Sequence, residues 1–277
     1  MSHDARLTLA RPDLASEMLE GIVHADRYER ARRMRLVIPG AAVRAASSVD
    51  AEQVDQLLFG ELFEVLDFED GFAWGQAARD GYVGWVEAAG LSARPIEPTH
   101  RVCALRTFSY LGPSIKTPSR GPFSLNALVV ASETSGVLTR VEGGGWIPSV
   151  HLSPIGAAFE APADVAERFV GTPYLWGGRD SVGIDCSGLV QQALYAAGRA
   201  CPRDTDLQAR LGVEIARETL ARGDLVFWRG HVGLMLDSVR LLHANAHHMA
   251  VAVEPLSEAI KRIAASGGGE PTAYRRL

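Results

Sequence analysis

The 277-residue sequence predicts a multidomain protein in which two small β-barrels precede an α+β domain. The length is sufficient for two or three domains of about 100–150 residues. Up to about residue 155, short runs of β-forming residues alternate with turn signals. After Ala161, apolar runs with helical spacing alternate with short apolar strands. We expect an N-terminal extension over 1–34, barrels over 35–92 and 93–158, and the α+β domain over 159–277.

The N-terminal extension is polar and carries four arginines between Arg27 and Arg33. A basic run of this kind is typical of a solvated helix face. The pattern over 13–23 favours a short helix that ends near Gly21. No chemistry is expected from this part of the chain.

The first barrel is predicted from β-like runs that follow one another at the spacing of 8–12 residues that short strands show. Three of them cover 62–66, 72–76 and 82–86. The turn signals Glu69-Asp70-Gly71 and Arg79-Asp80-Gly81 separate these runs. Regularly spaced short strands favour a small barrel.

The second barrel is predicted from a weaker form of the same pattern. Pro113, Pro118 and Pro122 mark a long loop in this region. Candidate strands cover 102–108, 127–131, 136–141 and 145–148. We therefore expect a more diverged copy of the first barrel.

Cys186 is the residue around which the α+β domain is organised. The apolar residues after it recur at helical spacing up to Gly198, and Asp185 occupies the N-cap position. A helix N-terminus presents unpaired N–H groups and partial positive charge, which stabilise a thiolate. The pattern favours a catalytic cysteine over a buried structural one. The remaining predicted elements are helices over 162–170, 204–210 and 256–263, and strands over 225–228, 251–253 and 272–275.

Two histidines downstream can serve this thiol. His231 opens one apolar run and His243 lies on the next, and Asp237-Ser238 between them reads as the turn of an antiparallel hairpin. A three-residue connection over 236–238 would place His231 opposite His243 on one face, whereas a two-residue turn would place them on opposite faces. The catalytic interpretation requires the odd-length connection. Cys186 is then the nucleophile, His231 the base and His243 the group that orients the base.

Composition narrows the class of protein further. The net charge of −5 gives no reason to expect nucleic-acid or membrane binding, and no run of about 18 apolar residues is present. The three cysteines form no paired framework and the first residues do not resemble a secretory leader, so we expect a cytoplasmic location. His247 and His248 are adjacent and would point to opposite faces of a strand, so no metal site is expected. No cofactor and no obligate protein partner are expected either.

Residues 161–277 resemble the NlpC family of papain-like bacterial cell-wall cysteine peptidases. The resemblance rests on five motifs in a characteristic order: Gly171-Thr172-Pro173-Tyr174-x-Trp176-Gly177-Gly178, Asp185-Cys186-Ser187-Gly188-Leu189-Val190, Gly223-Asp224-Leu225-Val226-Phe227, His231-Val232-Gly233 and His243-Ala244. Arg222 stands where many members have proline. Residues 60–66 and 80–86 in turn resemble a bacterial SH3-like module, and 93–158 a diverged second one. The combination resembles the γ-D-glutamyl-L-diamino-acid endopeptidases.

This resemblance implies a substrate and a set of residues that contact it. Members hydrolyse the γ-D-glutamyl-L-diamino acid bond of murein peptides that carry a free N-terminal L-Ala, and they release L-Ala-D-Glu for recycling. Their site lies between the first SH3-like module and the peptidase domain. The implied oxyanion residue is Tyr174, and the implied substrate-binding residues are Asp185, Ser187, Tyr82, Glu61 and Trp176. Carboxylates and a hydroxyl are also what an ammonium group requires in a narrow cleft.

Several alternatives stay open on the sequence alone. Asp185 can be only a helix cap, and the aromatic residues Tyr174, Trp176 and Tyr82 can be only core residues. The chain can be a catalytically silent protein that binds murein peptides, or an amidase or endopeptidase that acts on intact peptidoglycan. The diamino acid can be diaminopimelate or lysine.

Overall fold

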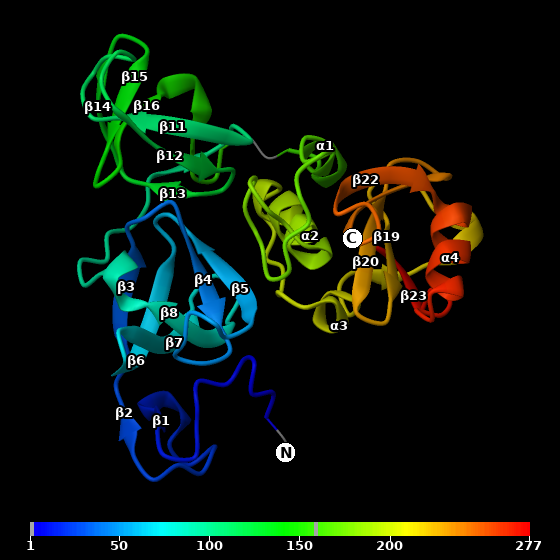
Figure 1. Ribbon diagram of the computed structural model, residues 1–277, viewed down its shortest axis with the longest axis horizontal. Coiled ribbons are helices and arrows are strands. Elements are labelled where there is room, and N and C mark those ends of the chain that lie inside the picture. Colours follow the sequence, from blue (N-terminus) through cyan, green and yellow to red (C-terminus); the bar gives the residue numbers. More distant parts are fainter. Residues whose placement is uncertain (1–2, 158–159) are drawn as a thin grey trace. The chain divides into compact units, whose positions relative to one another are not determined.

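The computed structural model describes residues 3–157 and 160–277 (Figure 1). The chain divides into two compact units, and the division falls between Ile155 and Gly156. Among the described residues, the first unit contains strands and 3-10 helices, whereas the second unit is mixed α and β. This order confirms the predicted fold class of β-barrels followed by an α+β domain. The predicted boundary between residues 158 and 159 lies outside the described residues.

The N-terminal segment packs against the first barrel. The predicted helix over 13–23 is wrong, because this segment is held by side-chain burial rather than by helical hydrogen bonds. Leu9 and Leu14 are buried in one cluster with Trp74 of the barrel. The guanidinium of Arg11 lies 4.3 Å from the centre of the Trp74 ring. The arginines between Arg27 and Arg33 are exposed, as predicted, but Arg32 and Arg33 belong to a strand rather than to a helix. The regular elements here are β1 (Ala15–Ser16), η1 (Glu17–Leu19) and β2 (Tyr28–Glu29).

Seven antiparallel strands form the first barrel, in the order β5-β4-β8-β7-β6-β3-β9. Inward-facing residues such as Phe63 and Val65 alternate along β6 with the more exposed Glu64, as expected for a strand with one buried face. Strand β7 is almost entirely buried because the N-terminal segment covers its outer side. The strands are β3 (Arg32–Leu36), β4 (Gly40–Arg44), β5 (Gln53–Leu58), β6 (Leu62–Glu69), β7 (Phe72–Ala77), β8 (Val83–Glu87) and β9 (Leu91–Ser92).

The next eight strands form two smaller sheets of the same unit, in the orders β13-β10-β17 and β12-β11-β16-β15-β14. As in the first barrel, the last two strands are joined by a 3-10 helix: η2 (Ala88–Gly90) precedes β9, and η3 (Ser149–His151) precedes β17. The strands are β10 (His100–Val102), β11 (Arg106–Tyr110), β12 (Ser119–Ser124), β13 (Leu128–Val129), β14 (Ala131–Ser135), β15 (Leu138–Val141), β16 (Gly145–Pro148) and β17 (Leu152–Pro154).

The long loop predicted from three prolines is partly wrong, because Pro122 belongs to strand β12. This strand lies at the edge of its sheet, where the missing N–H of a proline needs no partner. The two barrels also share core residues. Phe59, at the end of β5, packs edge-on against Phe123 of β12, with the ring centres 5.0 Å apart.

The second unit is a six-stranded sheet with helices on both sides, in the strand order β18-β23-β19-β20-β21-β22. Helix α2 packs against β20 and β21, and α4 covers the opposite side of the sheet (Figure 1). The strands are β18 (Val213–Glu214), β19 (Leu225–Trp228), β20 (His231–Met235), β21 (Arg240–Asn245), β22 (Ala250–Pro255) and β23 (Ala273–Arg276). The helices are α1 (Pro162–Glu167), α2 (Cys186–Ala196), α3 (Thr205–Gln208), η4 (Arg217–Thr219) and α4 (Leu256–Ala265).

Candidate active site

Cys186 is the first residue of helix α2. Asp185 is the N-cap, and its Oδ1 accepts a hydrogen bond of 2.7 Å from the backbone N–H of Gly188. Cys186 is 5% exposed, and its helix packs against strand β20. The prediction that the cysteine lies at the start of a helix is therefore confirmed.

Both histidines lie on the predicted hairpin and share one face of the sheet. Strands β20 and β21 pair with Leu234 opposite Leu242, and by this register Gly233 lies opposite His243. His231 is consequently a diagonal neighbour of His243. The predicted odd-length connection is confirmed, but the register that placed His231 directly opposite His243 is wrong.

The turn residue Asp237 explains this difference in register. Its Oδ1 accepts hydrogen bonds from the backbone N–H groups of Val239, at 2.8 Å, and Arg240, at 2.7 Å. The N–H of Leu236 donates to the carbonyl of Arg240, so the loop covers 237–239 rather than 236–238. Aspartate commonly fixes a turn in this way.

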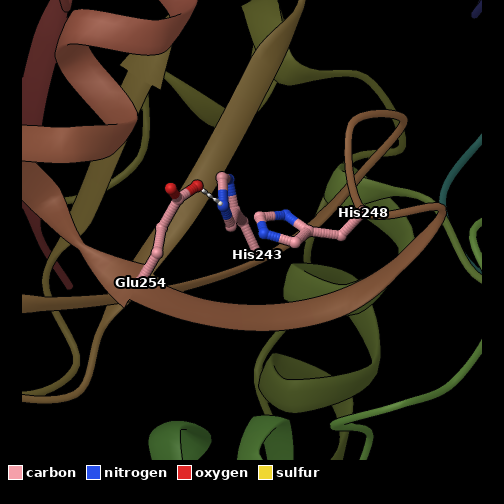
Figure 2. A group of neighbouring side chains, drawn as sticks. All are labelled: His243, His248 and Glu254. Atoms are coloured by element: carbon pink, nitrogen blue, oxygen red, sulfur yellow. Dashed lines mark hydrogen bonds and ion pairs between the residues drawn. The ribbon is translucent and has the colours of Figure 1, made fainter.

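A chain of hydrogen bonds runs from His231 across the sheet. His231 Nε2 and His243 Nδ1 are 2.8 Å apart, and His243 Nε2 and Glu254 Oε1 are also 2.8 Å apart (Figure 2). The same Glu254 oxygen accepts a hydrogen bond from Arg262 Nη2 of helix α4. Glu254 and Arg262 were not predicted. The sequence signal for Glu254 is the alternation of side chains along β22. Glu254 pairs with Leu241 of β21 and shares its face of the sheet.

Burial keeps both members of the Cys186–His231 pair neutral when each is considered alone. Desolvation and the nearby Asp185 carboxylate raise the pKa of the Cys186 thiol to about 12. Desolvation and the neighbouring His243 lower the pKa of His231 to about 3. The backbone N–H groups of Val232 and Ser187 and the charge of Arg203 act in the opposite direction and favour the thiolate. A thiolate at Cys186 therefore requires a group that takes up the thiol proton.

Tyr174 is anchored beside the cysteine. Its backbone N–H donates to the carbonyl of Met249 at 2.9 Å, and it forms a parallel bridge to Ile184. Burial, together with the negative charge of ionised Cys186 and of Asp185, raises the pKa of the Tyr174 hydroxyl above its ordinary value. The hydroxyl stays protonated and can donate a hydrogen bond to an oxyanion.

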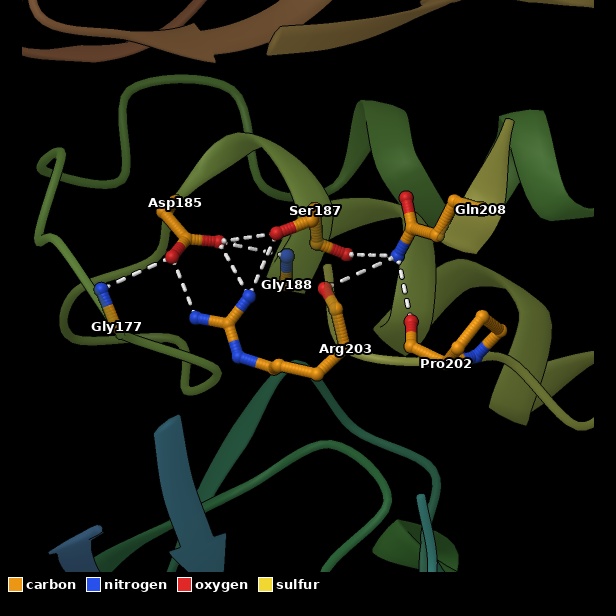
Figure 3. Close-up of polar contacts among 7 residues, drawn as sticks. All are labelled: Gly177, Asp185, Ser187, Gly188, Pro202, Arg203 and Gln208. Carbon is orange, nitrogen blue, oxygen red and sulfur yellow. Dashed lines mark hydrogen bonds and ion pairs between the residues drawn. The ribbon is translucent and has the colours of Figure 1, made fainter. Parts of the chain in front are cut away.

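Asp185 takes part in a buried network that the sequence did not predict (Figure 3). Arg203 binds both of its carboxylate oxygens, Nη1 to Oδ1 at 3.1 Å and Nη2 to Oδ2 at 2.5 Å. Oδ2 also accepts from the N–H of Gly177 at 2.9 Å. Ser187 donates to Oδ1 at 3.2 Å and accepts from Arg203 at 2.6 Å, and the Gln208 side chain donates to the Ser187 carbonyl. The helix-cap role that the sequence left open is therefore present.

The other predicted substrate-binding residues lie in different surroundings. Trp176 is 57% exposed in the loop before α2. Tyr82 and Glu61 belong to the first unit, and both are buried. Glu61 Oε2 accepts from the N–H of Leu58 at 3.0 Å, and Oε1 accepts from Arg79 at 2.7 Å. Their contact with a substrate stays a prediction.

His248 approaches the His243–Glu254 pair closely enough that one nitrogen or oxygen of each residue lies within 4.8 Å of the others (Figure 2). Such a cluster resembles a metal-ligand set. Both ring nitrogens of His243 are, however, already hydrogen-bonded, and the guanidinium of Arg262 next to Glu254 would repel a cation. The arrangement fits a hydrogen-bonded relay better than a metal centre.

A cysteine at the start of a helix, facing a sheet that carries its histidine base and the group that orients it, defines a papain-like thiol hydrolase. Comparisons with known proteins agree with this class. Residues 171–264 match the NlpC/P60 family, and residues 43–91 match the bacterial dipeptidyl-peptidase SH3 domain. The chain is a cysteine peptidase that carries an NlpC/P60 domain in its second unit and a bacterial SH3 domain in its first unit.

Individual relatives extend this similarity across both units. The gamma-D-glutamyl-L-lysine dipeptidyl-peptidase of Bacillus subtilis is 28% identical in an alignment of 228 positions that covers 74% of this chain and 76% of the relative. A protein of the same name from Bacillus cereus is 27% identical in an alignment of 203 positions that covers 64% of this chain and 61% of the relative. The crystal structure of an NlpC/P60 family protein from Bacillus cereus can be superposed on this chain, and the match covers 88% of this chain and 99% of the crystallised one. It has a TM-score of 0.75 at 20% identity and shares the fold.

Among residues 3–157 and 160–277, no helix is long and apolar enough to cross a membrane.

Proposed function

We propose that this protein hydrolyses the γ-D-glutamyl-L-diamino acid bond of murein peptides with a free N-terminal L-Ala and releases L-Ala-D-Glu. The observation that carries the proposal is the Cys186–His231–His243 arrangement in a chain that is similar, over both units, to peptidases named for the γ-D-glutamyl-L-lysine bond. Recycling of wall peptides and a cytoplasmic location are part of this proposal.

The chemistry follows from the pair of Cys186 and His231. The thiol proton moves to the His231 ring while the sulfur attacks the γ-carbonyl carbon of D-Glu, which forms a C–S bond and a tetrahedral oxyanion. The imidazolium then returns its proton to the amine of the diamino acid as the C–N bond breaks. Water, deprotonated by His231, attacks the thioester, and the dipeptide leaves as the carboxylic acid while the thiol is restored.

Two hydrogen-bond donors are available for the oxyanion. The backbone N–H of Cys186 lies at the N-terminus of α2, where it has no partner within the helix. The protonated hydroxyl of Tyr174 is the second donor. Both would strengthen as negative charge develops on the substrate oxygen, and this is the condition for lowering the barrier.

Recognition of the free amine is the part of the proposal that gives selectivity. Tyr82, Glu61, Asp185, Ser187 and Trp176 are the residues predicted to contact the dipeptide. N-acetylation of the substrate removes the positive charge and adds bulk at the amine. We therefore expect it to lower kcat/KM by at least about 100-fold, the effect of losing a charged hydrogen bond.

The first experiment is mass spectrometry of the products from L-Ala-γ-D-Glu-diaminopimelate, from its lysine analogue and from both N-acetylated peptides. Release of L-Ala-D-Glu from the free peptides alone supports the proposal, and the faster of the two identifies the diamino acid. Cleavage of free and N-acetylated peptides at equal rates contradicts amine recognition and favours an enzyme of wall remodelling. No cleavage of any peptide favours a protein that only binds murein peptides.

Matched cysteine variants control this experiment. Cys186→Ala should retain the fold and lose turnover, by about 10³-fold or more, because no other group can form the thioester. Cys201 is also buried and has no predicted role in the reaction. The Cys201→Ala protein should therefore have the kcat of the wild-type protein. Full activity of the Cys186→Ala protein would exclude the thiol mechanism.

A further inference from the structure

We infer that Glu254 is a positioning residue for the reaction and that it fixes the tautomers of both active-site histidines. The inference rests on the proposed function for its meaning, because it assigns a task within the same thiol–imidazole chemistry. It stands on the hydrogen bonds that join Glu254, His243 and His231.

The direction of each hydrogen bond in the chain follows from the carboxylate. Glu254 Oε1 can only accept, so His243 must carry its proton on Nε2. The Nδ1 atom of His243 is then an acceptor, and the atom facing it, His231 Nε2, must donate. His231 consequently carries its own proton on Nε2, and its Nδ1 keeps a lone pair. That lone pair is what a base for the Cys186 thiol requires.

Arg262 holds the carboxylate in this state and place. Its Nη2 donates to the same Oε1 atom that binds His243. The hydrogen bonds from His243 and Arg262 lower the pKa of Glu254 to about 2, although partial burial opposes this shift. The carboxylate is therefore ionised wherever the histidines are neutral. Its negative charge lies two hydrogen bonds from the imidazolium that forms on His231, and it favours that charge.

The placement also follows from the sheet. Strand β22 pairs with β21 so that Ala252 lies opposite His243 and Glu254 opposite Leu241. Glu254 is thus a diagonal neighbour of His243 on the face that helix α4 covers, where Arg262 lies. A glutamate here reaches Nε2 of His243, the ring nitrogen that does not contact His231.

Two substitutions separate the hydrogen bond from the charge. Glu254→Gln keeps a carbonyl oxygen that can accept from both His243 and Arg262, and it removes only the charge. Glu254→Leu removes both. We expect kcat to fall about tenfold in the Gln variant and about 100-fold in the Leu variant, with KM changed less than twofold. Glu258→Gln, an exposed site on α4, is the matched control and should keep its kcat.

Nuclear magnetic resonance of the ring nitrogens tests the inference without any substrate. In the wild-type protein both His231 and His243 should carry the proton on Nε2, and in Glu254→Leu the His243 ring should show a mixture of tautomers. A second readout is the rate at which iodoacetamide alkylates Cys186 between pH 5 and 9. This rate should fall in the order wild type, Gln, Leu.

The charged and titratable groups in and beside the hydrogen-bonded row are His231, His243, His248, Glu254 and Arg262. Those around the Cys186 sulfur are Asp185, Arg203 and Tyr174. A wild-type His243 protonated on Nδ1 would overturn the inference. Unchanged tautomers and alkylation in the Leu variant would also overturn it. Because neither readout uses a murein peptide, a wrong substrate assignment would leave both results intact, and the two failures are distinguishable.

Discussion

At the residue scale, the proposed chemistry depends on the buried thiol of Cys186 and the half-buried imidazole of His231. Each group is neutral when considered alone, since burial raises the thiol pKa and lowers the imidazole pKa. The enzyme therefore stores no free thiolate. In the proposed mechanism the charged pair forms by transfer of one proton from sulfur to ring, and the backbone N–H of Val232 and the charge of Arg203 favour the anion that results.

The pKa of His231 also predicts how stability changes with pH. The unfolded chain binds a proton on this histidine below about pH 6.5, whereas the folded protein does so only near pH 3. Between these values the unfolded state holds more protons, so the free energy of unfolding falls as the pH falls. His231→Gln cannot titrate and should flatten this part of the curve. Urea midpoints at pH 7, 5 and 4 measure the effect.

His243 also has a lowered pKa, so the His231→Gln variant should keep part of the pH dependence. Glu254 adds a loss of stability in the same direction as the pH falls from about 4.5 toward 2. A His231→Gln protein whose urea midpoint changes with pH as steeply as that of the wild type would contradict the lowered pKa of His231.

At the element scale, the start of helix α2 depends on the ion pair of Asp185 and Arg203. Both side chains are buried, and the guanidinium satisfies two carboxylate oxygens at once. Arg203 also offsets the effect of Asp185 on the Cys186 thiol, because the carboxylate raises the thiol pKa and the guanidinium lowers it. One residue thus caps the helix, holds the loop through Gly177 and neutralises a charge beside the nucleophile.

Removing one member of this pair should be costly. Asp185→Ala leaves Arg203 buried without its carboxylate and deletes the N-cap, and we expect the free energy of unfolding to fall by about 3–5 kcal/mol. In the double variant Asp185→Ala/Arg203→Met the loss should be smaller than the sum of the two single losses. Urea unfolding of the three proteins measures this coupling.

An exposed pair provides the control for this experiment. Glu258 and Lys261 lie on the surface of α4, with Lys261 Nζ 3.3 Å from Glu258 Oε1. Glu258→Ala should change the free energy of unfolding by less than about 1 kcal/mol. Losses that simply add in the Asp185/Arg203 double variant would contradict the buried ion pair.

Elements were predicted from the sequence where their signal is local. The helix start at Asp185-Cys186 and the shared face of His231 and His243 follow from short patterns, namely a capping residue and the parity of a hairpin loop. The register of that hairpin could not be predicted, because the side chain of Asp237 moves the loop by one residue.

Partners distant in the sequence could not be predicted at all. Arg203 is 18 residues from Asp185, and Glu254 is 11 residues from His243, each on a separate element. Such contacts depend on how elements pack, and no local pattern encodes this. The N-terminal segment shows the same limit, since burial of Leu9 and Leu14 replaced the helix that its composition favours.

At the scale of the whole molecule, the similarity to the Bacillus subtilis relative is not confined to the peptidase unit. The alignment covers 74% of this chain, which is more than the second unit contains, so it includes residues of the barrel unit as well. In the proposed function, the hydroxyl of Tyr82 in the first barrel is one of the groups that contact the substrate.

Tyr82→Phe tests this contribution, because it removes one hydroxyl from a buried side chain and leaves the ring in place. If the hydroxyl binds the substrate amine, kcat/KM for L-Ala-γ-D-Glu-diaminopimelate should fall about tenfold, whereas the low kcat/KM for the N-acetylated peptide should stay the same. Tyr28→Phe, in the N-terminal segment, serves as the control and should change neither value. An equal loss on both peptides would indicate a structural role for Tyr82, and no loss on either would exclude its hydroxyl from amine recognition.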